Sequence, residues 1–348
     1  MRAAFINRIG TAVPLFDVHR KFIDFATSVL GRDSEKRCFL RMIGRSQIEH
    51  RYSVLSQQCF ESGGFYERGK FPDTSERMVC FESEALRLAA TAIDQLDITS
   101  SKNEITHLIV ACCTGFYAPG LDIDIVTRFG LSPAVERTVV GFMGCYAGIS
   151  ALKLARHIVR SEPQAKVLVV NLELCTLHLQ EVDDLERMLC FSLWGDGCSA
   201  SLVSADPLGI ELQSFHTTTI EGSADQMAWR VGDHGFDMLL SGKVAPTIAR
   251  TLPGKVEAIL GIRPVGDIAL WAVHPGGRTI LDAVAQALRL DEDALSCSRE
   301  VLRRFGNMSS ATVIFVLKAM LERGLRGLGC AMAFGPGLTA ESMLFEAI

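Results

Sequence analysis

The sequence predicts an α/β protein, and two observations carry this prediction. First, short apolar runs without polar alternation recur along the chain, which is typical of strands covered on both faces. These runs span residues 105–113, 166–174, 197–204, 268–273 and 329–334. Second, segments with apolar residues at helical spacing lie between or beside them, at 76–94, 146–160, 279–290 and 310–323. Strands that alternate with helices indicate an α/β fold.

The length predicts two domains or one duplicated unit. The chain has 348 residues, and a domain holds roughly 150. The segment Asp206-Pro-Leu-Gly209 follows a predicted strand and has the composition of a turn. We therefore expect an N-terminal half over residues 1–206 and a C-terminal half over 207–348.

The composition excludes several classes of protein. The chain carries 35 basic and 40 acidic residues, a net charge of −5, which argues against general nucleic-acid binding. The apolar runs are far shorter than the ~20 residues of a membrane span. Asn7 and Arg8 interrupt the apolar start too early for a signal peptide, so a cytoplasmic location is expected. None of the 11 cysteines forms a C-x-x-C pair, so we expect reduced, buried thiols.

Cys145 is the first candidate for chemistry. It lies in the glycine-rich segment 141–148, where a predicted helix begins. The positive end of a helix dipole favours a thiolate and lowers the thiol pKa. Gly144 and Gly148 let the backbone turn sharply and let a substrate approach closely. The alternative is a small residue packed at a corner between a strand and a helix.

His274 is the second candidate, because it follows the predicted strand 268–273 and precedes Pro275-Gly-Gly277. Ligand sites in open α/β sheets lie at the carboxyl ends of strands. The proline and glycines end the strand and expose the ring. A structural histidine is the alternative. We expect His274 to pair with Cys145 as an imidazolium beside a thiolate.

Asn307 is the third candidate, and it precedes the predicted helix 310–323. Asparagine at such a position is most often an N-cap. Ser309 or Ser310 can take that role instead, which leaves the Asn307 amide free to donate a hydrogen bond to a developing oxyanion.

The three residues together suit a decarboxylative Claisen condensation. The cysteine holds an acyl group, the histidine acts as base and donor, and the asparagine adds a second donor to the thioester oxygen. Loss of carbon dioxide leaves a thioester enolate, whose oxygen needs donors nearby. The chemistry requires no metal and no cofactor.

The motifs resemble those of type III polyketide synthases, the chalcone-synthase-like branch of the thiolase superfamily. Five segments carry the resemblance, in family order: Gly144-Cys-Tyr-Ala-Gly148, Leu193-Trp-Gly-Asp-Gly197, His274-Pro-Gly-Gly277, Gly306-Asn-Met-Ser-Ser310 and Phe334-Gly-Pro-Gly-Leu338. With the basic segment that starts near Arg41, they extend over nearly the whole chain. Within this family, the sequence most resembles the bacterial alkylresorcinol and alkylpyrone synthases.

The resemblance implies a thiolase-like, five-layered αβαβα fold of two similar halves. The first half carries the nucleophile Cys145, and the second carries His274 and Asn307. The resemblance also implies a homodimer that loads an acyl starter from coenzyme A and extends it with malonyl-CoA. These coenzyme A thioesters are substrates and not cofactors.

The resemblance also assigns positions in the substrate cavity. Trp194 and Phe236 match two gatekeepers at its mouth, although Trp194 departs from the usual phenylalanine. The wall positions are Cys113, Ala118, Cys175 and His178. Ala118 matches a residue that crosses the dimer interface, where a small side chain leaves room for a long chain. We therefore expect a fatty acyl-CoA starter and an alkylpyrone or alkylresorcinol product. Trp229 is expected in the core.

A basic segment matches the coenzyme A site of the family. Arg41 and Arg45 are spaced i, i+4, so they share one face of a helix. Their guanidinium groups suit phosphate oxygens. Cys38 replaces a further lysine of the family pattern, and a solvated helix face is the alternative.

Several alternatives stay open on the sequence alone. A ketoacyl-acyl carrier protein synthase III shares the three residues, but it does not usually follow its histidine with Pro-Gly-Gly. Hydroxymethylglutaryl-CoA synthase lacks support, because no suitable glutamate is placed near Cys145. A catalytically silent thiolase-fold subunit would not need the three residues. Small or aromatic starters and the route of ring closure also stay open.

Overall fold

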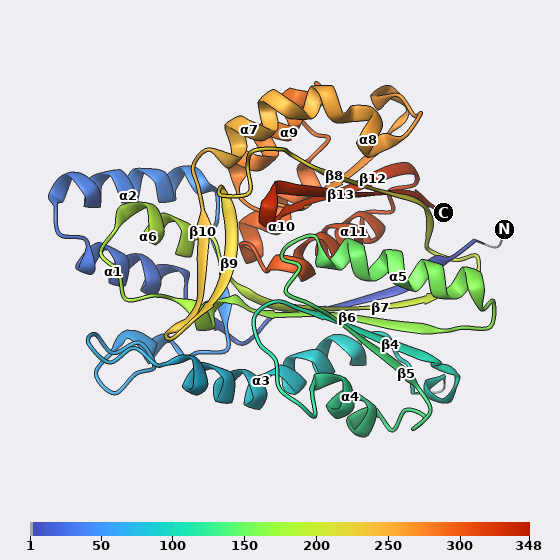
Figure 1. Ribbon diagram of the computed structural model, residues 1–348, viewed down its shortest axis with the longest axis horizontal. Coiled ribbons are helices and arrows are strands. Elements are labelled where there is room, and N and C mark those ends of the chain that lie inside the picture. Colours follow the sequence, from blue (N-terminus) through green and yellow to red (C-terminus); the bar gives the residue numbers. More distant parts are fainter. Residues whose placement is uncertain (1–2, 100) are drawn as a thin grey trace.

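Nine strands run through the centre of the molecule in two groups. The computed structural model describes residues 3–99 and 101–348 (Figure 1). The strand order is β11-β12-β13-β8-β1-β7-β6-β4-β5. The first group consists of β1 (Phe5–Ala12), β4 (His107–Cys112), β5 (Glu136–Gly141), β6 (Val167–Leu174) and β7 (Asp196–Ser204). The second consists of β8 (Ile210–Thr219), β11 (Leu270–Val273), β12 (Gly327–Gly335) and β13 (Thr339–Ala347).

The two groups are joined only over a short stretch. Strand β1 pairs with β7 along its length, but it pairs with β8 at Phe5 and Ile6 alone. Beyond that contact the groups separate, and two helices lie between them (Figure 1). The predicted turn Asp206–Gly209 connects β7 to β8, and therefore one group to the other.

The layers follow the order helix, sheet, helix, sheet, helix, which confirms the predicted five-layered α/β fold. The central layer holds α5 (Ala147–Ser161) and α11 (Thr312–Glu322). Helices α3 (Thr74–Asp94) and α4 (Leu121–Phe129) cover the outer face of the first group. Helices α7 (Val244–Thr251), α8 (Val256–Leu260) and α9 (Arg278–Leu288) cover the outer face of the second. Helix α10 (Ser296–Phe305) packs beside α11.

The sequences of the central elements explain their position. Every residue of β4, β6 and β7 is buried, as expected for apolar runs covered on both faces. In α11, the run from Thr312 to Leu317 is buried without interruption. A helix that is apolar all round is stable only inside a protein. Alanines and Gly148 on α5 allow the close approach that a central layer requires.

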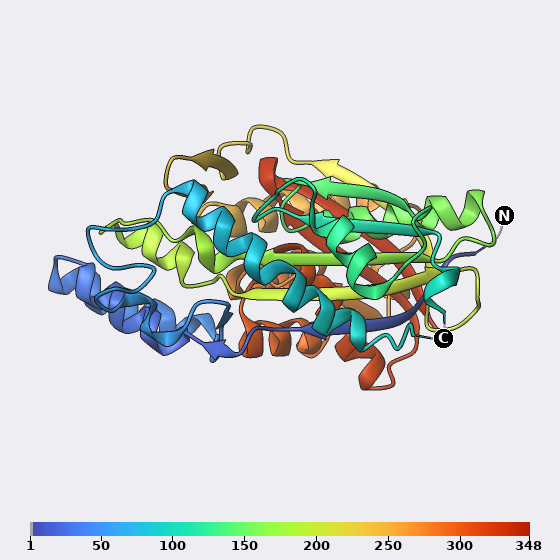
Figure 2. The same ribbon diagram turned by 90° about the horizontal axis from the view of Figure 1, so that it is seen from below.

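The remaining elements form an extension beside the layers. Helices α1 (His19–Val29), α2 (Asp33–Ser46) and α6 (Leu185–Phe191) project from one end (Figures 1 and 2). Strands β2 (Phe16–Asp17) and β3 (Tyr52–Ser53) form a small sheet. Strands β9 (Met227–Gly232) and β10 (Gly235–Leu240) form a hairpin. Within the described residues, no helix is long and apolar enough to cross a membrane.

A glycine in the central layer offers a test of this packing. A Cβ added at Gly148 would lie 2.4 Å from the Ser310 carbonyl oxygen, whereas one added at Gly44 in α2 would meet nothing within 4 Å. We expect Gly148→Ala to lower the free energy of unfolding by ~1–3 kcal/mol, as overpacking does. Gly44→Ala, the matched helical control, should raise it by ~0.5–1 kcal/mol. Urea denaturation measures both, and equal shifts would contradict this packing.

Candidate active site

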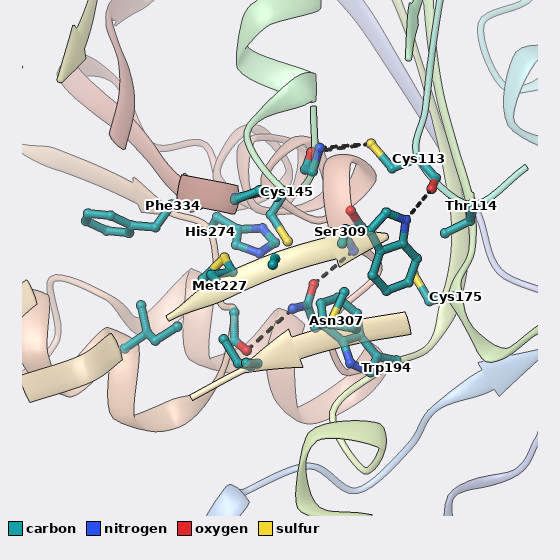
Figure 3. Close-up of a pocket in the computed structure, with 18 residues that line it drawn as sticks. Cys113, Thr114, Cys145, Cys175, Trp194, Met227, His274, Asn307, Ser309 and Phe334 are labelled. Carbon is teal, nitrogen blue, oxygen red and sulfur yellow. Dashed lines mark hydrogen bonds between the residues drawn. The ribbon is translucent and has the colours of Figure 1, made fainter. Parts of the chain in front are cut away.

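A buried cavity lies where the two halves meet, and we call it the reaction chamber (Figure 3). Residues from eight parts of the chain form its wall: Cys113, Thr114, Cys145, Cys175, Trp194, Met227, Trp229, Met238, Leu240, His274, Ile280, Asn307, Ser309 and Phe334. The space open to the centre of a water molecule is about 30 Å³. The chamber is therefore narrow, and most of its lining is apolar.

Cys145 lies just before α5, at a turn that only glycine can precede. Gly144 has φ +79°, and a Cβ at that position would lie 2.2 Å from Pro336 Cδ. The Gly144 carbonyl oxygen accepts a hydrogen bond from the Ala147 N–H at 2.9 Å, which starts the helix. The cysteine is buried, and its side chain lines the chamber (Figure 3).

His274 follows the last residue of β11, as the sequence predicts. Its backbone N–H donates to the Met332 carbonyl oxygen at 2.7 Å, which continues the pairing with β12. The ring is 2% exposed, and neither ring nitrogen has a hydrogen-bond partner among the described residues. Both nitrogens are therefore available to a substrate.

Asn307 is fixed by its backbone and by its side chain. Its N–H donates to the Leu193 carbonyl oxygen at 2.8 Å, and its own carbonyl oxygen accepts from the Gly195 N–H at 2.9 Å. Its Oδ1 accepts from the Ser309 N–H at 2.9 Å, so Nδ2 is the atom left to donate. That Nδ2 makes a long contact, 3.4 Å, with the Gly276 carbonyl oxygen and a hydrogen bond with the Cys145 sulfur.

The expected role of a serine as cap is wrong, although the consequence for Asn307 holds. Helix α11 has no side-chain cap at its N-cap residue Ala311. The Ser310 hydroxyl donates to Glu173 instead. The Asn307 side chain closes the turn itself through Oδ1, and its Nδ2 still remains a donor.

Burial opposes the expected charge state of Cys145 and His274 in the unliganded protein. Burial raises the pKa of Cys145 to about 12, with the carboxylate of Glu173 adding to the rise. Hydrogen bonds from Ser309 and Asn307 oppose this shift and are outweighed. Burial likewise lowers the pKa of His274 to about 3. Cys145 precedes the first residue of α5 by two positions, and desolvation exceeds the dipole effect there. Burial therefore favours a neutral thiol and a neutral imidazole.

The pH dependence of alkylation tests this charge state. Well below a raised pKa, the thiolate fraction grows ~tenfold per pH unit, so iodoacetamide should modify Cys145 correspondingly faster from about pH 7 to pH 9. Mass spectrometry of the peptide that contains Cys145 measures the rate, with Cys145→Ala as the background. A rate that is already constant at neutral pH would indicate the thiolate–imidazolium pair instead.

Three of the predicted cavity residues line the chamber. Cys113, Cys175 and Trp194 form part of its wall (Figure 3). Trp229, expected in the core, lies in the wall as well, and its Nε1 donates to the Cys113 carbonyl oxygen at 2.8 Å. That expectation was wrong because the hairpin of β9 and β10 covers the chamber and not the interior of a sheet.

Phe236 is not a wall residue, which corrects the predicted gatekeeper. It is fully buried and stacks on His178 with ring centroids 4.2 Å apart. Side chains two residues apart share a face of a strand, and Met238 and Leu240 on β10 take the positions over the chamber. The prediction therefore chose the right face of β10 but a residue two positions too early on it.

His178 and Ala118 also lie outside the chamber wall. His178 Nε2 contacts the Thr114 carbonyl oxygen at 2.7 Å, and its Nδ1 accepts from the Phe236 N–H at 3.0 Å. Burial lowers the pKa of His178 to about 3, so the ring is a neutral brace. Ala118 is exposed on the loop before α4.

A wider pocket lies outside the chamber, and we call it the outer funnel. It shares Leu240, Gly276 and Ile280 with the chamber wall and offers about 440 Å³ to the centre of a water molecule. Arg45 lines it, as the predicted coenzyme A site requires. Arg41 is exposed on the same helix but lies outside this lining.

Sequence reasoning missed a second cation of the outer funnel. Arg278 follows Gly277 directly, and its Nη1 donates to the Arg45 carbonyl oxygen at 3.0 Å. The contact joins α9 to α2, two elements that are more than 200 residues apart. The position of Arg278 directly after the motif His274–Gly277 was the feature of the sequence that could have pointed to it.

The fold and the buried cysteine, histidine and asparagine define the thiolase-like class of proteins. Models of the chalcone and stilbene synthases match nearly the whole chain, the N-terminal domain over residues 3–207 and the C-terminal domain over residues 211–348. The chain therefore belongs to this family, the type III polyketide synthases, whose members are acyltransferases. This match sets aside the ketoacyl-acyl carrier protein synthase III alternative.

Two relatives show how similar the chain is to known members. The alpha-pyrone synthesis polyketide synthase-like Pks18 of Mycobacterium tuberculosis is 38% identical over 259 residues, which is 70% of this chain. The match spans 66% of that relative's length. Bisdemethoxycurcumin synthase of Oryza sativa subsp. japonica is 32% identical over 99% of this chain and 92% of its own.

Solved structures of the family have the same fold. The C-terminal type III polyketide synthase domain of Steely1, a type I/III hybrid from Dictyostelium, superposes with a TM-score of 0.91 at 25% identity. The superposition covers 99% of this chain and 99% of that domain. PKS-I of the brown alga Ectocarpus siliculosus gives 0.89 at 25% identity, with 100% of this chain and 99% of that chain covered.

Proposed function

We propose that the protein transfers an acyl group from coenzyme A to Cys145 and extends it by decarboxylative condensation with malonyl-CoA. The observation that carries this proposal is the convergence of Cys145, His274 and Asn307 on one buried chamber. Each of the three brings a reactive group to it: a thiol, an imidazole whose nitrogens have no partner in the described residues, and an amide nitrogen that can donate. The reaction draws on side chains alone and needs no metal and no cofactor.

Loading begins with a proton transfer within the neutral pair. His274 takes the thiol proton of Cys145 as the sulfur attacks the carbonyl carbon of the acyl-CoA. The carbon–sulfur bond to coenzyme A then breaks, and the imidazolium returns the proton to the leaving thiolate. The product is an acyl thioester on Cys145 and free coenzyme A.

Extension uses the donors of the second half. The thioester oxygen of malonyl-CoA accepts hydrogen bonds from His274 and Asn307 Nδ2. Carbon dioxide leaves, and the electron pair of the broken bond forms an enolate whose negative oxygen these donors stabilise. The enolate carbon attacks the acyl carbonyl carbon, and the sulfur of Cys145 departs. A dry chamber protects the enolate from protonation by water.

The outer funnel suits the coenzyme A part of both substrates. Arg45 and Arg278 supply two forked cations at its wall, and guanidinium groups bind phosphate oxygens in pairs of hydrogen bonds. The funnel lies next to the chamber, so a pantetheine arm can extend from one into the other. Arg41 lies one helical turn from Arg45 and adds a further cation nearby.

Charge removal at the outer funnel tests this assignment. We expect Arg45→Ala and Arg278→Ala each to raise the KM for malonyl-CoA ~tenfold, because each removes hydrogen bonds to a charged group. The KM for malonyl-N-acetylcysteamine, which lacks the phosphates, should stay within about twofold. Arg263→Ala, an exposed arginine away from the funnel, is the control. An equal rise of the KM for malonyl-CoA and for malonyl-N-acetylcysteamine would contradict a phosphate site.

A fatty acyl starter and an alkylpyrone or alkylresorcinol product are the finer part of the proposal. The largely apolar wall of the chamber and the likeness to an alpha-pyrone synthesis polyketide synthase-like protein support it. Small or aromatic starters are the second candidate. The narrow chamber and the likeness to bisdemethoxycurcumin synthase favour that candidate.

Product analysis by mass spectrometry decides between the two. The protein is incubated with malonyl-CoA and acetyl-, coumaroyl-, hexanoyl- or dodecanoyl-CoA. We expect triketide or tetraketide products from the alkyl starters and none from Cys145→Ala. Products from aromatic starters alone would overturn the fatty acyl assignment. No product without an acyl carrier protein would overturn the proposed function itself.

We also propose a homodimer that forms along β5. This strand ends the sheet, and five of its six residues are exposed, including Val139. Phe116, Phe142 and Met143 add exposed apolar surface next to it. An open edge with apolar neighbours is a typical association site. Sedimentation equilibrium tests this, and a monomer at micromolar concentration would contradict it.

A further inference from the structure

A second cavity lies directly behind the wall of the reaction chamber, and we call it the inner cavity. Cys175 and Trp194 line both cavities, so one layer of side chains separates them. The inner cavity also offers about 30 Å³ to the centre of a water molecule. Its other walls are mostly apolar and include Val18, Phe22, Leu55, Cys59, Phe60 and Phe191.

Arg51 is the exception in this apolar lining. It is 2% exposed, and its guanidinium group lies 4.6 Å above the Phe22 ring. Nε donates to His19 Nδ1 at 2.9 Å, and Nη1 donates to the Trp194 and Phe191 carbonyl oxygens at 2.8 and 3.2 Å. Nη2 has no partner. A buried donor without an acceptor loses its hydration and gains nothing in return.

The other polar groups of the inner cavity leave donors and not acceptors unsatisfied. The Ser53 and Thr176 hydroxyls lie 2.7 Å apart, and Thr176 Oγ1 donates to Asp196 at 2.7 Å. Besides Arg51 Nη2, the other buried donor of the described lining is Trp194 Nε1, which has only the Cys190 sulfur as a weak partner. A ligand that fits this cavity therefore has to supply an acceptor.

The charge of Arg51 persists in this position. Burial lowers its pKa to about 10, so the side chain stays protonated at neutral pH. Burial and the positive charge of Arg51 lower the pKa of His19 to about 3, so His19 stays neutral and accepts the Nε hydrogen bond. An oxygen that reached Nη2 would therefore gain a charge-assisted hydrogen bond.

The partition between the cavities can open without moving the catalytic backbone. The Trp194 carbonyl oxygen is held by Arg51, and the residues on either side pair with Asn307. The indole N–H contacts only the Cys190 sulfur, a weak acceptor, so rotation of this ring breaks one weak hydrogen bond. Rotation about its side-chain bonds would join two narrow spaces into one longer space that begins at Cys145.

We propose that the inner cavity is a second acyl subsite, which receives the far end of a starter chain that carries an oxygen acceptor. The starter is then an acyl-CoA with a hydroxyl or carbonyl oxygen remote from the thioester. The apolar wall contacts the chain, and Arg51 Nη2 donates to the remote oxygen. This inference rests on the proposed function, because it concerns the substrate of the same site.

Matched starters test the proposal. Initial rates are measured with hexanoyl-CoA, dodecanoyl-CoA and ω-hydroxydodecanoyl-CoA, with malonyl-CoA as extender. We expect kcat/KM to be ~tenfold higher for the hydroxylated long starter than for the plain one, the value of a hydrogen bond to a charged group. Arg51→Met should reduce this ratio to about one. Equal values for the two starters in the unmodified protein would overturn the proposal.

A control separates recognition from a loss of stability. Arg77 is also a buried arginine whose Nη1 donates to two carbonyl oxygens and whose Nη2 has no partner in the described residues, but it lines neither cavity. Arg77→Met should destabilise the protein comparably and leave the ratio between the two long starters unchanged. A ratio that falls equally in both variants would show that Arg51 acts through folding alone and would overturn the proposal.

Filling the inner cavity gives a test that does not depend on Arg51. Cys59 and Leu55 line the inner cavity and not the chamber. We expect Cys59→Phe or Leu55→Phe to lower kcat/KM at least ~tenfold for both long starters and to keep it within about twofold for hexanoyl-CoA. Unchanged values for the long starters would overturn the proposal. No product from hexanoyl-CoA in the unmodified protein would overturn the proposed function instead.

Discussion

The backbone pairing of Leu193 and Gly195 with Asn307 is the contact on which the site depends. It ties the segment before β7, in the first half, to the loop before α11, in the second. Trp194 is held at the same point by Arg51, whose Nη1 donates to its carbonyl oxygen. Trp194 and Asn307, the proposed gate and the proposed oxyanion donor, are therefore parts of one junction. Cys145 and His274 reach the same chamber from α5 and β11.

Desolvation governs the chemistry that this junction permits. The thiol and the imidazole are both buried, so each keeps its neutral form until a substrate arrives. In such an environment, a hydrogen bond to a developing negative charge is worth more than it is in water. The neutral His274 ring and Asn307 Nδ2 suit an enolate that forms and disappears within one turnover. An open, wet site would not hold this state.

The sequence was sufficient for the fold and for the three catalytic candidates, because both depend on local patterns. Apolar runs marked β4, β6 and β7, and glycines marked the turns that carry Cys145 and Asn307. The charge state was not predictable, because it depends on burial by segments distant in the chain. Phe236 was predicted as a gatekeeper from its position in the segment 232–236, and a linear pattern does not show that Met238, two residues further along the same strand face, lines the chamber instead.

The wall of the chamber shows the same limit more clearly. His178 stands near wall positions in the sequence, yet its two hydrogen bonds turn it into a brace between Thr114 and Phe236. Trp229 has the large apolar side chain that is typical of a core residue, but the β9–β10 hairpin folds over the chamber and places the indole in its wall. Which side chains face a cavity depends on how a hairpin lies across a distant sheet.

Release of carbon dioxide from malonyl-CoA in the absence of a starter tests most directly whether the donors and the nucleophile have separate roles. The account predicts that Cys145→Ala still releases carbon dioxide and forms acetyl-CoA, since His274 and Asn307 stabilise the enolate without the thiol. Asn307→Ala should slow the release ~hundredfold, the usual cost of one oxyanion donor. Loss of decarboxylation in Cys145→Ala, with full release in Asn307→Ala, would contradict the account.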